Sequence, residues 1–219
     1  MTDPRTRSIN SPPVTSHQTP PLASPVTHLL YLHGFRSSPQ SFKAKMLAAW
    51  LAEHRPDVTW CCPQLPPSPR AAIVLAEQGT AGWPRETMAV LGSSLGGFYA
   101  TVLAERWGCR AVVMNPAVQP ARDLAAHVGE HQAFHDPALR FDFRAEYIDE
   151  LRELSASAPG PVMRPERYFA LIAKGDELLD WREMSARYRG AAGRLLEGSD
   201  HGLSDFAEHL PALLSFLQL

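Results

Sequence analysis

A chain of 219 residues is long enough to bury a sizeable core, and it predicts one domain or one domain with a small insertion. Its 21 basic and 23 acidic residues nearly balance and form no long run of one sign, so neither a nucleic acid nor an anionic membrane surface is expected as a partner. No stretch approaches about 18 uninterrupted apolar residues, and the first residues lack the apolar core of a secretory signal, so neither a membrane span nor a secretory signal is expected.

Three cysteines, Cys61, Cys62 and Cys109, make an odd number, and two of them are adjacent. Adjacent residues of a strand point to opposite faces, so a bridge between Cys61 and Cys62 is not expected. All three occur in apolar, strand-like stretches and are interpreted as small buried hydrophobic residues. A reducing cytoplasm is therefore the predicted location.

Residues 1–25 contain six prolines and many serines and threonines, with no apolar periodicity. A segment this poor in apolar residues cannot contribute to a core, so we expect a disordered leader. The folded domain is expected to extend over residues 26–219.

Strands and helices alternate along this domain. In chain order the patterns predict strand 27–32, helix 42–54, strand 58–62, helix 69–78, strand 86–91, helix 97–106, strand 111–114, strand 168–173, helix 181–188, strand 193–196 and helix 206–217. Such alternation predicts an α/β fold with a mainly parallel sheet and helices on both faces. A sheet of this kind places its functional site at the carboxyl ends of the strands.

Residues from about 116 to 167 interrupt the alternation, because one crossover helix would need far fewer residues. Tyr147, Leu151 and Leu154 fall at helical spacing, and residues 121–128 show a weaker helical pattern. An insertion after the carboxyl end of a strand lies above the edge of the sheet. The segment therefore predicts a small helical cap over the site.

The segment Gly92-Ser93-Ser94-Leu95-Gly96 lies between a predicted buried strand and a predicted helix. A G-x-S-x-G sequence in this context is the nucleophile elbow of the α/β-hydrolases, a turn too sharp for bulky neighbours. The turn exposes the serine hydroxyl in front of a helix N-terminus. Ser94 is therefore the predicted nucleophile.

A serine hydroxyl needs a base, and in this fold the chain order is serine, acid, histidine. His201 follows the last predicted strand on a loop bracketed by glycines, and it is the predicted base. His209 lies inside the final helix, where a solvated face explains it. His33 precedes Ser94 and is expected to support the loop after the first strand.

The acid that orients the base must lie after Ser94 in a loop that follows a strand, and the fifth predicted strand offers a candidate. Asp176 leaves the carboxyl end of this strand, 25 residues before His201, and is the predicted acid. Glu177 and Asp180 compete with it. Asp180 is also explained as the N-cap of the next helix, and Asp200 adjoins His201 too closely to contact its ring easily.

Two backbone N–H groups are expected to bind the oxyanion that forms during acyl transfer. One donor is predicted to be Leu95, the residue after the nucleophile, and the other Phe35, in the loop after the first strand.

Three histidines, His127, His131 and His135, are spaced by four residues and raise a zinc hypothesis, since imidazoles on one helical face can share a metal. Gly129 weakens such a helix, and a serine mechanism needs no metal. They are interpreted as surface histidines of the cap, and neither a metal nor a cofactor is expected.

Over residues 28–219 the sequence resembles the YqiA/YcfP-type esterases, a family of small α/β-hydrolases. The resemblance rests on Leu30-Tyr31-Leu32-His33-Gly34-Phe35-Arg36-Ser37-Ser38-Pro39, Gly92-Ser93-Ser94-Leu95-Gly96-Gly97, Asn115-Pro116-Ala117, Gly175-Asp176-Glu177 and the His201 loop. It implies an esterase that acts on acyl esters or thioesters with Ser94, Asp176 and His201 as its triad. The long leader and the segment Asp200-His201-Gly202 depart from the usual pattern.

Three functions remain open from the sequence. The first is a serine hydrolase of carboxylic esters that works through an acyl-enzyme. The second is an acyl-CoA thioesterase with the same triad, and the third is a non-catalytic binding module on a hydrolase scaffold.

Overall fold

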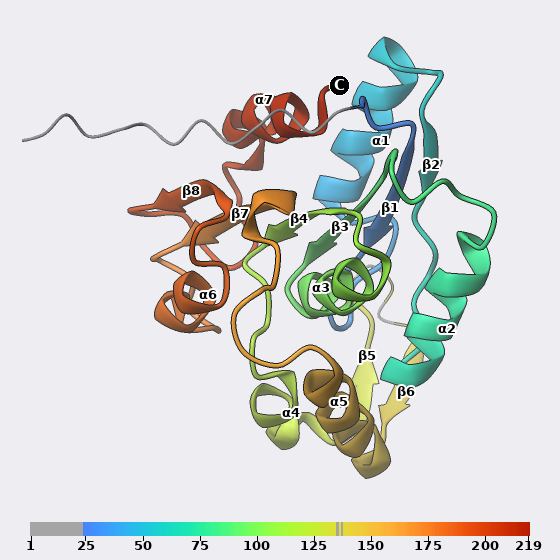
Figure 1. Cartoon of the computed structure of the whole chain (residues 1–219). Coiled ribbons are helices and arrows are strands. Elements are labelled where there is room, and N and C mark those ends of the chain that lie inside the picture. Colours follow the sequence, from blue (N-terminus) through green and yellow to red (C-terminus); the bar gives the residue numbers. More distant parts are fainter. Residues whose placement is uncertain (1–23, 135, 137) are drawn as a thin grey trace, which may run out of the picture.

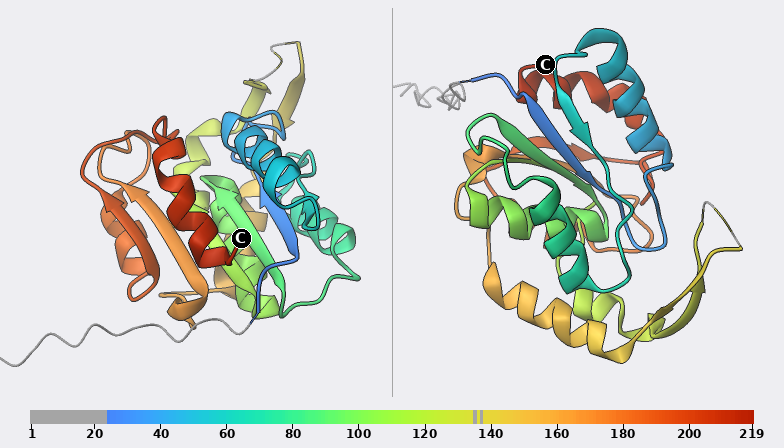
Figure 2. Two further views of the ribbon diagram at one scale, coloured as in Figure 1. Left: turned by 90° about the horizontal axis from the view of Figure 1, so that it is seen from above. Right: turned by 90° about the vertical axis from the view of Figure 1, so that its right-hand side faces the viewer.

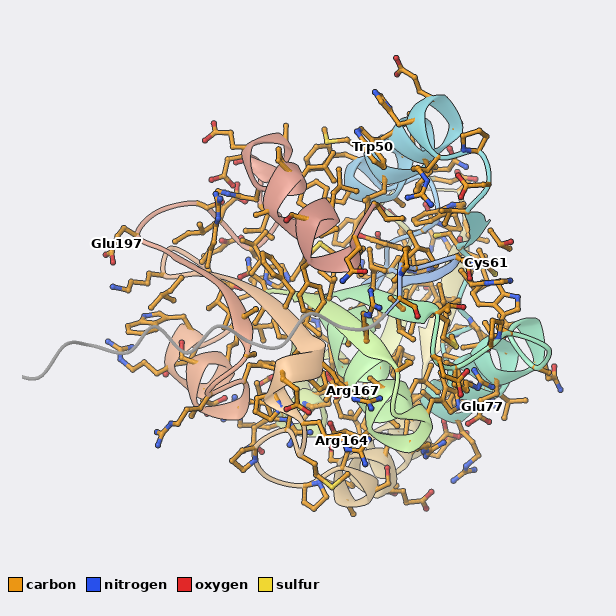
Figure 3. The ribbon with its side chains drawn as sticks, turned by 45° about the horizontal axis from the view of Figure 1, so that its top comes forward. Trp50, Cys61, Glu77, Arg164, Arg167 and Glu197 are labelled. Atoms are coloured by element: carbon orange, nitrogen blue, oxygen red, sulfur yellow. The ribbon has the colours of Figure 1, made fainter. Side chains whose placement is uncertain are left out.

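The computed structural model describes residues 24–134, 136 and 138–219. Its main sheet has six strands, all parallel, in the order β2-β1-β3-β4-β7-β8. The strands are β1 (His28–Leu32), β2 (Thr59–Cys61), β3 (Met88–Ser93), β4 (Arg110–Met114), β7 (Tyr168–Ala173) and β8 (Ala192–Leu196). The two edges of this sheet, near the labelled Cys61 on β2 and Glu197 just after β8, lie on opposite sides of the molecule (Figure 3). The predicted parallel α/β sheet is therefore confirmed.

Helices cover both faces of the sheet because side chains of one strand alternate between its faces. On β1, Leu29 and Tyr31 pack in the cluster that includes α1 and α7, whereas Leu30 and Leu32 pack in the cluster that includes α2, α3 and α6. Figure 1 shows these two layers on either side of the sheet. The helices are α1 (Phe42–His54), α2 (Pro69–Gly79), α3 (Leu95–Trp107), α6 (Trp181–Arg187) and α7 (Phe206–Leu217).

The first described residues contact the folded domain. Val26 is fully buried, and its N–H donates to the carbonyl oxygen of Leu217 at 3.3 Å. The guanidinium of Arg110, which is buried at the start of β4, donates to the carbonyl oxygen of Ser24. Ser24, which was expected in the leader, therefore contacts the folded domain. The rest of the expected leader, residues 1–23, lies outside the described residues.

The insertion between β4 and β7 packs as a cap, but it is not wholly helical. It contains α4 (Pro120–Asp123), a 3₁₀ turn at Ala125–His127, the antiparallel pair β5 (Gly129–Gln132) and β6 (Arg140–Phe143), α5 (Ala145–Ser157) and a 3₁₀ turn at Pro165–Arg167. The hairpin of β5 and β6 projects from the body of the molecule (Figure 2).

The hairpin has a simple physical cause. Phe141 and Phe143 alternate with polar residues, so both rings lie on one face of β6, and Phe143 is fully buried. The helix expected near residues 121–128 is only partly formed, because the regular helix ends at Asp123 and a 3₁₀ turn follows at Ala125–His127.

The bounds of most single elements agree with those that the sequence predicts. The helices at 42–54 and 206–217 have the expected bounds, while β2 is shorter than the predicted strand 58–62. All three cysteines are free, but only Cys109 is fully buried, and Cys61 and Cys62 are partly exposed. In the part of the chain described, no helix combines the length and apolar character needed to cross a membrane.

Close approach of β7 and β8 requires a glycine at residue 193. Gly193 has φ of 148°, and a Cβ there would overlap the carbonyl oxygen of Ala170 on β7. Because β7 leads to Asp176 and β8 leads to His201, this contact sets the distance between the two loops that follow them.

Gly193→Ala should lower the free energy of unfolding by more than about 1 kcal/mol, because the strands must separate or the backbone must distort. Urea unfolding measures this loss. Gly79→Ala is the matched control, since a Cβ there meets nothing within 4 Å. Equal stabilities of the two variants would contradict the packing argument.

Candidate active site

The turn between β3 and α3 holds Ser94 in an unusual backbone conformation. Ser94 has φ of 56° and ψ of −122°, which a non-glycine residue rarely adopts. Its N–H donates to the carbonyl oxygen of Met114 at 3.0 Å, and its own carbonyl oxygen accepts from the N–H of Ala117 at 3.0 Å. The end of β4 therefore holds this turn in place.

Glycines are required on both sides of Ser94 because the backbone segments approach closely. A Cβ at Gly92 would overlap the carbonyl of Gly96, and a Cβ at Gly96 would overlap the carbonyl of Leu32 at the end of β1. The sharp, glycine-flanked turn expected from the sequence is present between the expected strand and helix.

Ser94, His201 and Asp176 come from three different loops and meet at the carboxyl edge of the sheet. The His201 Nε2 atom lies 3.0 Å from Ser94 Oγ, and the His201 Nδ1 atom lies 2.8 Å from Asp176 Oδ2. The Asp176 side chain is fully buried, and that of His201 is 16% exposed. The structure thus brings the three sequence-predicted residues into one line of hydrogen bonds.

The Asp176 carboxylate is fixed by the loop that carries it. Its Oδ1 atom accepts from the N–H groups of Leu178 and Leu179, each at 2.8 Å, which leaves Oδ2 for the His201 ring. A carboxylate with both oxygens engaged has little freedom to rotate.

The competing acids occupy other positions. Glu177 Oε2 accepts from the backbone N–H of His201 at 2.9 Å, so it contacts the loop and not the ring. Asp180 caps α6, accepting from the N–H of Arg182 at 2.8 Å, as expected. Asp200 accepts from the N–H of Ser204 at 2.9 Å. This hydrogen bond lowers the pKa of Asp200.

Asn115, to which the sequence analysis assigned no role, joins two of these loops. Its Nδ2 group donates to the carbonyl oxygens of Asp200 at 2.9 Å and His201 at 3.1 Å, and its Oδ1 accepts from the N–H of Ala173 at 2.8 Å. The residue is fully buried and has φ of 41°. It lies directly after β4. The sequence signal for its role was a polar residue placed directly after an apolar strand.

The loop after β1 lies directly against Ser94. A Cβ at Gly34 would stand only 3.1 Å from the Ser94 Cβ. The imidazole of His33 contacts the carbonyl oxygen of Gly34 at 3.0 Å through Nδ1, and its Nε2 accepts from the N–H of Leu65 at 3.0 Å. His33 therefore supports this loop, which contains Phe35. In the described part of the chain, no hydrogen bond uses the backbone N–H of Phe35 or Leu95.

A cavity of about 400 Å³ opens over Ser94 and His201. Its apolar walls include Leu124 and Leu179, and its charged walls include Lys43 and Asp123. A second cavity of about 540 Å³ lies across the loop after β1 and shares some of its wall.

Burial shifts the pKa values of two charged groups in the cavity over Ser94 in opposite directions. Desolvation lowers the pKa of Lys43 to about 8, while the nearby charge of Asp200 opposes this shift. Desolvation raises the pKa of Asp123 above its ordinary range, while Arg122 opposes this effect.

The histidine cluster considered as a metal site does not form the expected helical face. His127 lies in a 3₁₀ turn and His131 on β5, where its ring contacts the carbonyl oxygen of His127. His135 lies outside the described residues. Within residues 24–134, 136 and 138–219, no group of three or more metal-binding side chains occurs.

Residues 28–218 match the family model described as "Uncharacterised protein family (UPF0227)". The chain belongs to this family. Membership of UPF0227 confirms the resemblance to the YqiA/YcfP-type family that the motifs indicated.

Solved structures resemble this UPF0227 member over most of its length. A putative hydrolase from Agrobacterium vitis S4 is 16% identical, with a TM-score of 0.67 and coverage of 87% of both chains. Alpha/beta hydrolase domain-containing protein 10 from mouse is 14% identical, with a TM-score of 0.64 and coverage of 89% of this chain and 92% of that one. Est1E from Butyrivibrio proteoclasticus, solved with ferulic acid bound, is 13% identical, with a TM-score of 0.65 and coverage of 92% and 91%. These similarities confirm the predicted α/β-hydrolase fold.

Asn115→Ala should lower the free energy of unfolding by at least about 2 kcal/mol, because it removes three hydrogen bonds. One of the three is donated by the buried N–H of Ala173, which would lose its partner. Chemical denaturation measures this change. Gln40→Ala, which removes an exposed amide, is the control and should change stability by less than about 0.5 kcal/mol. A loss no larger than that of the control would show that Asn115 does not join the loops.

Proposed function

We propose that this protein is a serine hydrolase that cleaves carboxylic esters through an acyl-enzyme. One observation carries the proposal: Ser94 Oγ, the His201 ring and the Asp176 carboxylate are joined at 3.0 and 2.8 Å beside a cavity. Structural neighbours described as hydrolases and esterases support the same class of chemistry.

In the first half of the proposed reaction, Ser94 Oγ attacks the ester carbonyl carbon while His201 Nε2 takes the hydroxyl proton. The carbonyl electron pair moves to oxygen and forms a tetrahedral oxyanion. When the oxyanion collapses, the bond to the alcohol oxygen breaks, and His201 gives its proton to that oxygen. The alcohol leaves, and the acyl group remains on Ser94.

In the second half, water takes the place of the alcohol. His201 accepts a proton from water, the resulting oxygen attacks the acyl carbon, and the Ser94 Oγ leaves with the proton returned by His201. The products are a carboxylic acid and free enzyme, so no oxidant, metal or cofactor enters the balance.

Asp176 is proposed to hold the His201 ring in the tautomer that presents an unprotonated Nε2 to Ser94. Its buried carboxylate also stabilises the imidazolium that forms in each half-reaction. The hydrogen bonds from Leu178 and Leu179 support this role, because they aim Oδ2 at the ring.

The backbone N–H groups of Phe35 and Leu95 are proposed to bind the oxyanion. Leu95 begins α3, so its N–H belongs to the first turn, where helix amides lack partners within the helix. The contact between Gly34 and Ser94 supports the placement of Phe35 on the other side of the reacting carbonyl.

We also propose a reducing cytoplasm as the location of this protein. Three free cysteines, two of them partly exposed, support such a compartment.

Ser94→Ala should reduce hydrolysis of 4-nitrophenyl esters by several orders of magnitude and should abolish labelling by a fluorophosphonate, with little change in melting temperature. Ser215→Ala, an exposed serine on α7, is the matched control. Activity of Ser94→Ala within about tenfold of the wild type would contradict the proposal. A panel with acyl-CoA substrates shows in the same assay whether thioesters are the better substrates.

Asp176→Asn should lower kcat by roughly 10⁴, because an amide neither selects the productive tautomer nor stabilises the imidazolium. Asp180→Asn should leave kcat nearly unchanged and should cost less than about 1 kcal/mol of stability, because asparagine is also a good N-cap. Steady-state kinetics and thermal unfolding of the pair separate the two roles. The reverse result, with Asp180→Asn inactive, would reassign the acid.

A further inference from the structure

Lys43 is a buried lysine in the wall of the cavity that contains Ser94. The residue is 8% exposed, at the second position of α1, and it lines the cavity together with His201 and Gly202. Its ammonium group donates to the carbonyl oxygen of Gly202, the residue after His201. An ammonium group has three N–H donors, so one carbonyl does not satisfy it.

No described carboxylate forms an ion pair with Lys43. Asp200 acts on it only as a nearby charge, and the first turn of α1 contains no acidic residue. The N-terminal end of this 13-residue helix adds partial positive charge of its own. Burying an unpaired ammonium is costly, so a residue in this position calls for a functional explanation.

The other charged groups of the cavity leave it basic. Asp123 also lines the cavity, and its Oδ1 atom is paired at 2.7 Å with Arg122, which pairs with Glu183 as well. Its buried Oδ2 atom has no hydrogen-bond partner among the described residues. Arg36 adds a second cation, held by a hydrogen bond from its Nε to the carbonyl oxygen of Gln132 at 2.9 Å. The cavity wall therefore contains two cations, Lys43 and Arg36, against one acid, Asp123.

We infer that Lys43 recognises a carboxylate on the substrate, so that the preferred substrates are anionic esters with a second, unesterified carboxylate. This inference rests on the proposed ester hydrolysis at Ser94. The substrate carboxylate would take up the free N–H donors of Lys43 while the ester carbonyl lies at Ser94. At neutral pH the ammonium is charged in most molecules, because the pKa of Lys43 is about 8.

The test compares matched neutral and anionic esters with the wild-type protein. On the acyl side, 4-nitrophenyl hexanoate is compared with the 4-nitrophenyl monoester of adipic acid. On the alcohol side, 4-acetoxybenzamide is compared with 4-acetoxybenzoate. We expect the anionic member of at least one pair to have a kcat/KM about tenfold higher or more, mainly through KM, as for a charge-assisted hydrogen bond. Equal values within both pairs would overturn the inference.

The variant Lys43→Met removes the charge and keeps most of the apolar side chain. It should abolish the preference for the anionic ester. Loss of the Gly202 contact alone would slow both members of a pair equally, so the ratio of the two kcat/KM values separates recognition from support of the His201 loop. Lys45→Met, an exposed lysine on the same helix, is the charge-matched control and should keep the preference.

A preference that persists in Lys43→Met would also overturn the inference. If Lys43→Met does not fold, Lys43→Gln is measured in the same way, and the wild-type comparison stands by itself. Hydrolysis of neutral and anionic esters at equal rates would refute only the role of Lys43. Absence of both hydrolysis and fluorophosphonate labelling would refute the proposed function as well.

Discussion

The strained turn at Ser94 is the constraint on which the site depends. A serine with φ of 56° costs on the order of 1–3 kcal/mol, which the surrounding structure must offset. Hydrogen bonds to the backbones of Met114 and Ala117 stabilise it, and Gly92 and Gly96 allow β3, α3 and β1 to approach within contact. The turn places Ser94 at the end of β3, an inner strand of the sheet.

The Ser94 hydroxyl contacts the His201 ring only if the loops after β7 and β8 hold a fixed position relative to it. The loop that carries His201 is held through its backbone by side chains from three directions. Asn115 reaches it from β4, Lys43 from α1 and Glu177 from the loop after β7. Since each contact is to a main-chain atom, the position of the His201 ring depends on tertiary packing more than on the neighbouring sequence.

The cap and the loop after β1 contact each other directly. The N–H of Phe134 donates to the carbonyl oxygen of Arg36 at 2.9 Å, and the Phe35 ring lies 5.1 Å from the buried ring of Phe143. The β5–β6 hairpin therefore fixes one wall of the cavity. On the other side, Arg122 of α4 pairs with Glu183 of α6 at 2.7 Å, which ties the cap to the sheet helices.

The sequence by itself determined the features that depend on local spacing. The strand–turn–helix pattern around Ser94 and the bounds of α1 and α7 follow from apolar periodicity and from glycines at fixed offsets. The order of Ser94, Asp176 and His201 along the chain predicted that these residues meet, because a parallel sheet brings the ends of its strands to one edge. It left Glu177 and Asp180 as competing acids.

Only the tertiary structure decided the contacts between residues far apart in the chain. Lys43 and Gly202 are separated by 159 positions, and no local pattern predicts that they meet. Asp176 and Glu177 are adjacent carboxylates, and the loop geometry alone decides which one contacts the His201 ring and which one its backbone. Short-range patterns reflect backbone geometry, which is local, whereas hydrogen bonds between loops depend on how the whole sheet and its helices pack.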